Sequence, residues 1–406
     1  MIARVFPGKL SGEIAAIPSK SHVHRLLICA SFADGPTEIA CPAVSEDISA
    51  TARCVSALGA RVTRTEEGFR VAPGPVFPSP TLDCGESGST YRFMLPVACA
   101  LGAEARFLLA GRLPVRPMDA LFTALGAHGI EVSGGGTAAV STKGKLTGGA
   151  FELPGDVSSQ FVSGLLMAAP LMGAHCEIRL TSPLASKGYV DITLSALGMF
   201  GVEAQWRGES LLVPGGQAYR SPGAARAEGD WSNAAFFLCA AAARGGGAGV
   251  TGLDPASPQG DRAVAEIVAR FGNPPHGIDV DISDIPDLAP PLAVLGAAAA
   301  GATRLLNAGR LRLKESDRIA SIVETLAALG AEIRAEGDAI VIEGGKPLKG
   351  GAVEARGDHR IPMMAACAAC LCQCPVEIAG AEAVNKSYPG FFDDLRRLGL
   401  AVETEV

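Results

Sequence analysis

The sequence contains few aromatic residues, no run of like charges and no apolar stretch long enough to span a membrane. Only 5% of the 406 residues are aromatic, whereas 48% are hydrophobic and 50 are glycine. A core made from this composition relies on aliphatic and small side chains. The net charge of −7 and the absence of five consecutive like charges argue against binding to nucleic acid or to a membrane surface. Any anion must therefore be bound by cations that folding collects locally.

No segment of the sequence has the pattern of a membrane span or a secretion signal. The longest apolar stretch, residues 288–302, is too short to cross a bilayer, and we expect Pro290 and Pro291 to break it. The N-terminal segment MIARVFPGKLSGEI has no apolar core of the kind found in signal peptides. We therefore expect a cytoplasmic protein without membrane association.

The eleven cysteines are expected to be free thiols. An odd number of cysteines without a secretion signal is typical of a reducing compartment. Cys367, Cys370, Cys372 and Cys374 have spacings that resemble a metal site, but they lie in the apolar run MMAACAACLCQC, where cysteine acts as a small hydrophobic residue. We expect no metal ion, and a metal or redox centre at these thiols is the alternative.

One pattern recurs six times along the chain: an apolar helix, a glycine and a short strand, often followed by a turn and a second strand. The glycines lie 58 to 75 residues apart, at Gly59, Gly126, Gly201, Gly272, Gly330 and Gly399. Glycine here predicts a helix end in the left-handed conformation. The alternation that follows, as in residues 339–342, predicts a half-buried hairpin. We expect six small α+β units in two lobes of three, although helix–glycine–strand is common in α/β proteins.

The first polar motif, residues 18–25, precedes the apolar segment LLICASFA. We predict Ser21 as the N-cap of a helix whose free N–H groups attract anions, with Lys20 and Arg25 adding full charges. The alternative is a plain capped helix with solvated cations.

Three further motifs precede apolar segments in the first half of the chain. In residues 84–92, small residues around Gly88 permit close approach of a ligand to the backbone. Arg116 stands before a helix opened by proline, and Ser186 begins a weaker motif of the same kind. Residues 158–160, Ser-Ser-Gln, offer three neutral polar side chains, which suit a phosphate or sugar hydroxyls, whereas one serine would suffice as a cap.

The strongest motif is residues 311–318, which precede the amphipathic segment IASIVETLAALG. Lys314 and Arg318 stand before and in the first helical turn, where the helix dipole disfavours cations. We therefore expect something anionic to compensate them, and a ladder of surface salt bridges is the alternative. Asp287, Arg360 and Lys386 also precede apolar segments. If the lobes face each other, these helix starts form a positive cleft in an acidic protein.

Taken in order from residue 20 to residue 389, these motifs closely resemble the enolpyruvyl transferase family, in particular its branch that acts on shikimate 3-phosphate. The resemblance implies a two-lobed inside-out α/β barrel of six βαβαββ repeats, three per domain. The lobes are expected at residues 1–19 with 229–406 and at residues 20–228, and they are expected to close on the substrates.

The implied reaction transfers the enolpyruvyl group of phosphoenolpyruvate to the 5-hydroxyl of shikimate 3-phosphate and releases phosphate. It belongs to the shikimate pathway, which leads to chorismate and the aromatic amino acids. The resemblance implies no metal and no organic cofactor, inhibition by glyphosate as a family property, and small-molecule substrates as the partners. We expect a monomer.

The resemblance also assigns roles to single residues. Asp287 is the expected base for the 5-hydroxyl, Glu315 the expected proton donor to the methylene carbon, and Lys20 a catalytic residue that touches both substrates. The other residues expected to bind shikimate 3-phosphate, besides Asp287, are Ser21, Arg25, Ser158, Ser159, Gln160, Ser186 and Lys314. Those expected to bind phosphoenolpyruvate, besides Lys20, are Gly88, Arg116, Gln160, Arg318, Arg360 and Lys386.

Seven of these residues are cations, and the two substrates together carry about five to six negative charges. Two positions depart from the family pattern: Glu86 replaces a frequent asparagine, and Arg310 stands where some relatives have asparagine.

Two alternatives remain within the same fold. UDP-N-acetylglucosamine enolpyruvyl transferase normally carries a reactive cysteine before its Arg-Pro-x-Asp motif, and residues 105–115 contain none. A non-catalytic anion-binding relative is disfavoured because both Asp287 and Glu315 are retained together with all seven cations.

Overall fold

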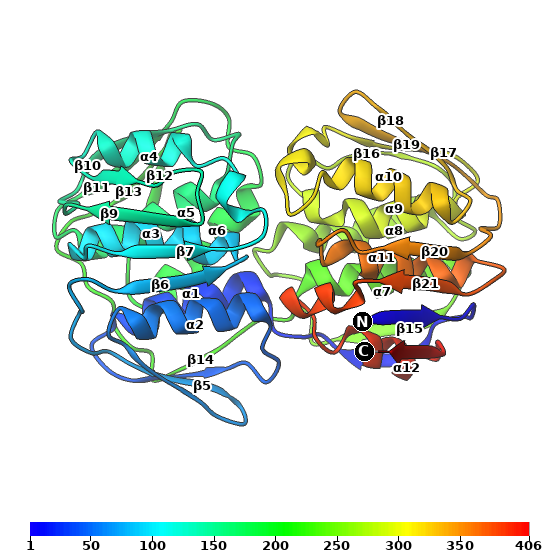
Figure 1. Ribbon diagram of the computed structural model, residues 1–406, viewed down its shortest axis with the longest axis horizontal. Helices are drawn as coiled ribbons and strands as arrows, with labels where there is room; N and C mark the ends of the chain where they lie inside the picture. Colours follow the sequence, from blue (N-terminus) through cyan, green and yellow to red (C-terminus); the bar gives the residue numbers. More distant parts are fainter. Residues whose placement is uncertain (406) are drawn as a thin grey trace. The chain divides into compact units, whose positions relative to one another are not determined.

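The computed structural model describes residues 1–405, which form two compact units. Unit 1 comprises Met1–Ile17 and Gly229–Val406, and unit 2 comprises Pro18–Glu228. In Figure 1, unit 2 runs from blue to green, whereas unit 1 runs from green to red and includes the dark blue N-terminal strands. Each unit has its own apolar core, because each of the two clusters of buried side chains draws its members from one unit alone.

Unit 2 contains three four-stranded sheets with the same topology. In each sheet the first pair of neighbours is parallel and the other two pairs are antiparallel. The first sheet has the order β14 (Ala224–Arg226), β3 (Thr37–Ala40), β5 (Gly68–Ala72), β4 (Arg61–Arg64). The second has the order β6 (Thr81–Gly85), β7 (Arg106–Leu109), β9 (Ala139–Lys143), β8 (Glu131–Ser133). The third has the order β10 (Gly149–Leu153), β11 (Cys176–Leu180), β13 (Ser210–Val213), β12 (Gln205–Arg207).

Unit 1 repeats this topology twice. One sheet has the order β16 (Asp279–Asp281), β17 (Gly301–Leu306), β19 (Ala339–Gly344), β18 (Glu332–Glu336). The other has the order β20 (Gly351–Glu354), β21 (Val376–Ala379), β1 (Ile2–Val5), β22 (Val402–Glu405), so both ends of the chain share one sheet. The remaining sheet pairs β2 (Ser11–Ala15) with β15 (Gly247–Thr251) and has two strands within the described residues 1–405.

Six helices are buried along nearly their whole length. They are α1 (Lys20–Ser31), α3 (Gly88–Leu101), α5 (Ser159–Ala168), α7 (Trp231–Arg244), α9 (Ala289–Ala298) and α11 (Arg360–Ala368). Beyond their polar first turns, their sequences are mostly apolar, as is typical of interior helices. The strands of the sheets alternate between buried and exposed residues, for example in β1, so one face of a sheet packs inward and the other meets solvent.

The other six helices bury one face only. They are α2 (Glu46–Ala57), α4 (Asp119–Gly126), α6 (Lys187–Met199), α8 (Val264–Phe271), α10 (Arg318–Ala328) and α12 (Phe391–Arg397). The expected class, α/β with helices inside and sheets outside, is therefore confirmed (Figure 1). The expected number of six repeats is not confirmed, because five sheets share the four-stranded topology and the sixth has two strands.

The repeat glycines behave as predicted except at one position. Gly59, Gly201, Gly330 and Gly399 adopt positive φ after a helix, and Gly272 does so at the end of α8. Gly126 is still helical, and the positive φ occurs three residues later at Gly129. After Gly272 a single strand, β16, follows and pairs in parallel with β17.

Two expectations about helix starts were wrong as well. Ser19, not Ser21, occupies the N-cap position of α1, so Ser21 lies inside the first turn. Pro290 and Pro291 do not break α9, because they occupy its first turn, where a missing N–H costs nothing.

The cysteines of the described chain are all free thiols, and all except Cys374 are buried. No helix within residues 1–405 combines the length and the apolar character that a membrane crossing requires. In the same range, no group of three or more His, Cys, Asp or Glu side chains is arranged to hold a metal ion.

Candidate active site

The predicted site residues gather at the N-terminal ends of helices in both units. In unit 2 they lie in the first turns of α1, α3 and α5, in the turn before α6, and after the short 3-10 helix η1 (Leu113–Val115). In unit 1 they lie just before or in the first turns of α9, α10 and α11, and at the end of the 3-10 helix η7 (Ala381–Lys386). Each unit therefore presents its own group of cations and free backbone N–H groups.

Gln160 joins the starts of α5 and α3 in unit 2. Its amide oxygen accepts from Nη1 of Arg92 at 2.8 Å, and its amide nitrogen donates to Oγ of Ser89 at 2.9 Å. Ser158 is the N-cap of α5 and accepts from the backbone N–H of Gln160 at 3.3 Å. Arg92 was missed as a candidate, since the sequence placed it one turn inside an apolar helix without indicating its partner.

Gly88 lies under two guanidinium groups. A Cβ atom added at Gly88 would stand 2.8 Å from Nη1 of Arg116 and 2.9 Å from Nη1 of Arg92. Glycine at this position therefore lets two cations approach the N-terminal end of α3. Glu86, where the family pattern differs, is exposed, and its carboxylate lies over Gly111.

Arg25 is buried, with 1% of the residue exposed, and is bonded by neutral oxygens. Its guanidinium donates to Oγ1 of Thr193 at 2.7 Å, to the carbonyl oxygen of Tyr189 at 2.9 Å and to the carbonyl oxygen of Ser21 at 2.5 Å. It also lies over the ring of Phe93. Burial lowers the pKa of Arg25 to about 9, so a nearby anion would stabilise its charge.

The serines predicted near Arg25 have different environments. Ser186 is 1% exposed and adopts the left-handed conformation, with φ of 57°, at the start of α6. Such a conformation is uncommon for serine and is often found where function constrains the backbone. Ser159 is buried in the first turn of α5, and Ser21 is half-buried.

Lys20 forms an ion pair with a residue that the sequence did not single out. Its ammonium lies 2.6 Å from the carboxylate of Asp47, in the first turn of α2, and both side chains are mostly buried. The two residues are 27 positions apart, so no local pattern predicts the contact.

Arg318 is the centre of the unit 1 group. Its guanidinium binds Asp358 through two hydrogen bonds, from Nε at 2.8 Å and from Nη2 at 3.1 Å. It also donates to Asp287 at 2.9 Å and to Glu315 at 2.5 Å. Burial alone would lower the pKa of Arg318, but the three carboxylates outweigh it and raise the pKa above its usual value. The anionic compensation expected for Arg318 is therefore supplied by the protein's own carboxylates.

Asp287 is surrounded by cations. Besides Arg318, its carboxylate accepts from Nη2 of Arg360 at 3.0 Å and from Nζ of Lys314 at 3.5 Å. Coulomb attraction to these groups favours the ionised carboxylate, which is the form that accepts a proton. Burial lowers the pKa of Lys314 to about 8, and the neighbouring Asp287 only partly offsets this.

Three further residues of unit 1 hold this group in place. Asp358 is fully buried and also accepts from Oγ of Ser316 at 3.0 Å. Ser232, at the start of α7, accepts from Nη2 of Arg360 at 2.7 Å. Lys386 donates to the carbonyl oxygen of Gly357, next to Asp358, at 2.7 Å. Asp358 could have been found in the sequence, because it lies two residues before Arg360.

Asp261 is a buried carboxyl that interacts electrostatically with Arg360, and the sequence did not indicate it. It lies in the 3-10 helix η3 (Gly260–Ala263) with 5% of the residue exposed. Burial, and to a lesser extent the negative charge of Asp287, raise the pKa of Asp261 to about 7, against the opposing effect of Arg360. A carboxyl with this pKa carries a proton in about half of the molecules at neutral pH.

Comparisons with known proteins agree with this geometry. The family model for EPSP synthase (3-phosphoshikimate 1-carboxyvinyltransferase) matches residues 6–395. The chain belongs to the EPSP synthase family. It is 38% identical to the 3-phosphoshikimate 1-carboxyvinyltransferase of Clostridium beijerinckii, over 98% of this chain and 97% of that protein. It is 41% identical to the enzyme of the same name from Halobacterium salinarum, over 98% of this chain and 99% of that protein.

Solved structures of the EPSP synthase family have the same fold. The EPSP synthase of Acinetobacter baumannii superposes with a TM-score of 0.82 at 25% identity, covering 99% of this chain and 100% of that one. The resemblance stated from the motifs is therefore confirmed over nearly the whole chain.

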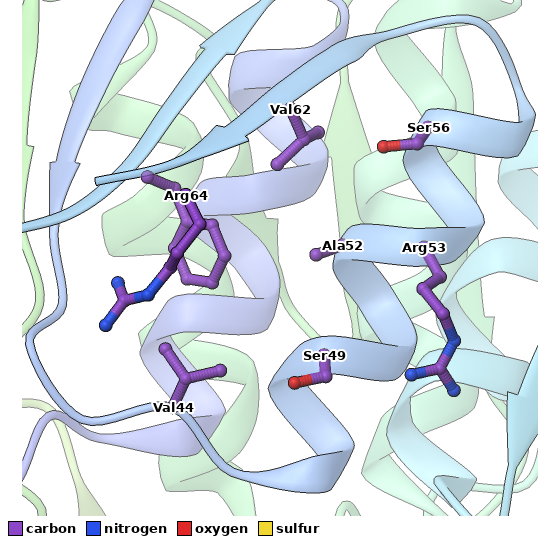
Figure 2. A pocket seen from close by; sticks show the side chains of 8 residues that line it. Val44, Ser49, Ala52, Arg53, Ser56, Val62 and Arg64 are labelled. Atoms are coloured by element: carbon purple, nitrogen blue, oxygen red, sulfur yellow. The ribbon is translucent and has the colours of Figure 1, made fainter. Parts of the chain in front are cut away.

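Unit 2 also has an open groove that is not part of the predicted site. It has a volume of about 630 Å³ and lies between α2 and the hairpin of β4 and β5 (Figure 2). Its lining residues are Val44, Ser49, Ala52, Arg53, Ser56, Val62, Arg64 and Phe69. None of the predicted site residues lines it, and Arg64 is already bonded to three backbone carbonyls.

Replacing Asp358 by asparagine is expected to lower the free energy of unfolding by about 3 kcal/mol, because the buried Arg318 loses the one carboxylate that binds it through two hydrogen bonds. The measurement is denaturant-induced unfolding. Glu324→Gln removes an exposed ion pair with Arg356 in the same unit and is the control, with an expected change below about 1 kcal/mol. Equal effects of the two substitutions would contradict the role given to Asp358.

Asp261→Asn is expected to change how stability depends on pH. Since the pKa of Asp261 is about 7 in the folded protein and its ordinary value is 3.8, the wild type loses stability as the pH rises between these values. Asparagine at position 261 has no titratable group, so this loss of stability is absent in the variant. Its stability relative to wild type should therefore rise by about 1.4 kcal/mol per pH unit between pH 5 and 7 and level off above pH 8. A difference that does not vary with pH would show that Asp261 is ionised throughout.

Proposed function

We propose that this protein transfers the enolpyruvyl group of phosphoenolpyruvate to the 5-hydroxyl of shikimate 3-phosphate, giving 5-enolpyruvylshikimate 3-phosphate and phosphate. The observation that carries the proposal is that Asp287 and Glu315, the expected base and acid, are bonded to the same guanidinium, that of Arg318. Family membership supplies the reaction, and the geometry of unit 1 supplies a way to perform it.

The reaction is an addition followed by an elimination. Asp287 takes the proton of the 5-hydroxyl while the hydroxyl oxygen attacks C2 of phosphoenolpyruvate. Glu315 gives a proton to the methylene carbon, which becomes a methyl group. In the second step the bond between C2 and the phosphate oxygen breaks, its electrons leave with the phosphate, the methyl group returns a proton to the ionised Glu315, and the double bond is restored. Two carboxyls that work in opposite directions need different environments. Asp287 contacts three cations, and Glu315 contacts Arg318.

Shikimate 3-phosphate is bound in this proposal by Arg25 and Lys20, by the polar starts of α5 and α6, and by Lys314. The polar residues are Ser21, Ser158, Ser159, Gln160 and Ser186. Burial supports a role for Arg25, because an anion would replace neutral partners around a buried cation.

Phosphoenolpyruvate is bound by guanidinium and ammonium groups, and Gly88 allows the approach of one of them, that of Arg116. These groups belong to Lys20, Arg116, Arg318, Arg360 and Lys386, and Gln160 also contributes. Arginine suits carboxylates and phosphates because its planar fork donates two parallel hydrogen bonds.

The related transferase that uses a UDP-amino sugar is not favoured. The curated relatives with 36–41% identity over nearly the full chain carry the name 3-phosphoshikimate 1-carboxyvinyltransferase. A non-catalytic relative is also disfavoured, because Asp287 and Glu315 are both present in one bonded group.

Phosphorus NMR of the purified protein with candidate substrates tests the function. Inorganic phosphate should appear only when phosphoenolpyruvate and shikimate 3-phosphate are both present, together with a new signal from the vinyl ether product. Phosphate release with phosphoenolpyruvate and UDP-N-acetylglucosamine, or no release with either acceptor, would overturn the proposal.

Glu315→Gln is expected to lower kcat by a factor of about 100 to 10,000, since the amide keeps the hydrogen bond to Arg318 but cannot donate the proton. The KM values should change by less than about threefold. Glu324→Gln, the same substitution on the outer face of α10, is the control and should leave kcat unchanged. A Glu315→Gln protein with near-normal turnover would remove Glu315 from the mechanism.

Gly88→Ala is expected to raise the KM for phosphoenolpyruvate about tenfold and to weaken glyphosate inhibition, because the added methyl group displaces the guanidinium groups of Arg116 and Arg92. Thermal stability should change little, since the clashing atoms are the ends of flexible side chains. Gly198→Ala, in helix α6 with nothing within 4 Å of the added atom, is the matched control. Unchanged kinetics for Gly88→Ala would place phosphoenolpyruvate elsewhere.

A further inference from the structure

The ion pair between Lys20 and Asp47 connects the starts of two helices. Lys20 begins α1, where the helix dipole disfavours a cation, whereas Asp47 lies in the first turn of α2, where the dipole favours an anion. The two charges are 2.6 Å apart, and 16% and 13% of their side chains are exposed. A pair this sheltered is screened less by solvent than a surface pair.

A chain of buried hydroxyl groups fixes the helix that carries Asp47. Oγ1 of Thr51, one turn after Asp47, lies 2.7 Å from Oγ1 of Thr90 in α3 and 2.6 Å from Nδ1 of His24 in α1. Oγ1 of Thr90 also lies 2.8 Å from Oγ of Ser87, the N-cap of α3, and 3.4 Å from the carbonyl oxygen of Asp47. The first turns of α1, α2 and α3 are therefore tied together by side chains.

His24 suits this chain because it stays neutral. Burial, with the nearby positive charges of Lys20 and Arg25, holds the pKa of His24 well below its ordinary value. A neutral imidazole bonds to the hydroxyl of Thr51 without adding a third positive charge to the first two turns of α1.

We propose that Asp47 is a positioning residue for catalysis: the Thr51–Thr90–His24 chain fixes the helix that carries Asp47, and the Asp47 carboxylate holds the Lys20 ammonium in the orientation from which it contacts both substrates. This inference rests on the proposed function, which gives Lys20 that contact. Asp47 itself does not need to touch a substrate.

Because Asp47 is charged, a positioning role and a purely structural role predict different effects when its charge is removed. A carboxylate near an anion site repels the substrates, so its neutralisation favours their binding by Coulomb's law. Loss of the Lys20 orientation, in contrast, slows the chemical step. Positioning therefore predicts a lower kcat without weaker binding of shikimate 3-phosphate. Loss of structure predicts that both become worse together.

The test measures kcat with both substrates, the Kd of shikimate 3-phosphate by calorimetry, and Tm. Asp47→Asn should lower kcat at least tenfold, while the Kd of shikimate 3-phosphate stays within about threefold of wild type or becomes tighter. Asp47→Glu, which restores the charge, should recover part of kcat. Glu38→Gln is the control, because Glu38 pairs with Arg70 at the same distance of 2.6 Å but on the exposed surface of unit 2.

Two results would overturn the inference. One is a kcat of Asp47→Asn within twofold of wild type. The other is a parallel loss of kcat, binding and Tm in which Asp47→Glu does no better than Asp47→Asn. Both results apply only if the wild-type protein turns over phosphoenolpyruvate and shikimate 3-phosphate. A wild type that does not would instead refute the proposed function, and this inference with it.

Discussion

The two hydrogen bonds between Arg318 and Asp358 are the interaction on which the unit 1 site depends. Both side chains are buried, and a buried guanidinium without a carboxylate partner would be strongly destabilising. Since the same guanidinium also binds Asp287 and Glu315, the position of Asp358 determines where both expected catalytic carboxyls stand. Asp287 in turn binds Arg360 and Lys314, so the group behaves as one network rather than as separate pairs.

The site residues of unit 2 are also joined by side-chain contacts, but more of their partners are neutral. Its buried helices also begin with polar side chains, and these are joined across helices by Gln160, by Thr51 and by the pair of Lys20 and Asp47. Arg25 differs from Arg318 in having neutral oxygens as partners. The protein thus compensates some cations by its own carboxylates and surrounds Arg25 with neutral oxygens.

The sequence allowed the fold class and the helix starts to be predicted, because periodicity and terminal glycines are local signals. It could not indicate that Arg318 pairs with Asp358, 40 residues away, or that Gln160 pairs with Arg92, 68 residues away. Such contacts depend on how buried helices stack. For the same reason β1 was not foreseen as the partner of β21 and β22, since the two ends of a sheet can come from opposite ends of a chain. Ser21 was misassigned by two residues because either serine satisfies the local N-cap pattern.

We propose that cations held in place by the protein's own carboxylates form the binding site for two anionic substrates. A crystal structure with shikimate 3-phosphate and phosphoenolpyruvate bound would test this proposal. Arg318 and Arg360 are expected to contact phosphoenolpyruvate while Arg318 keeps both hydrogen bonds to Asp358, and Asp287 is expected to reach the 5-hydroxyl. A structure in which the substrates bind away from Arg318, or in which Arg318 leaves Asp358 to bind them, would contradict it.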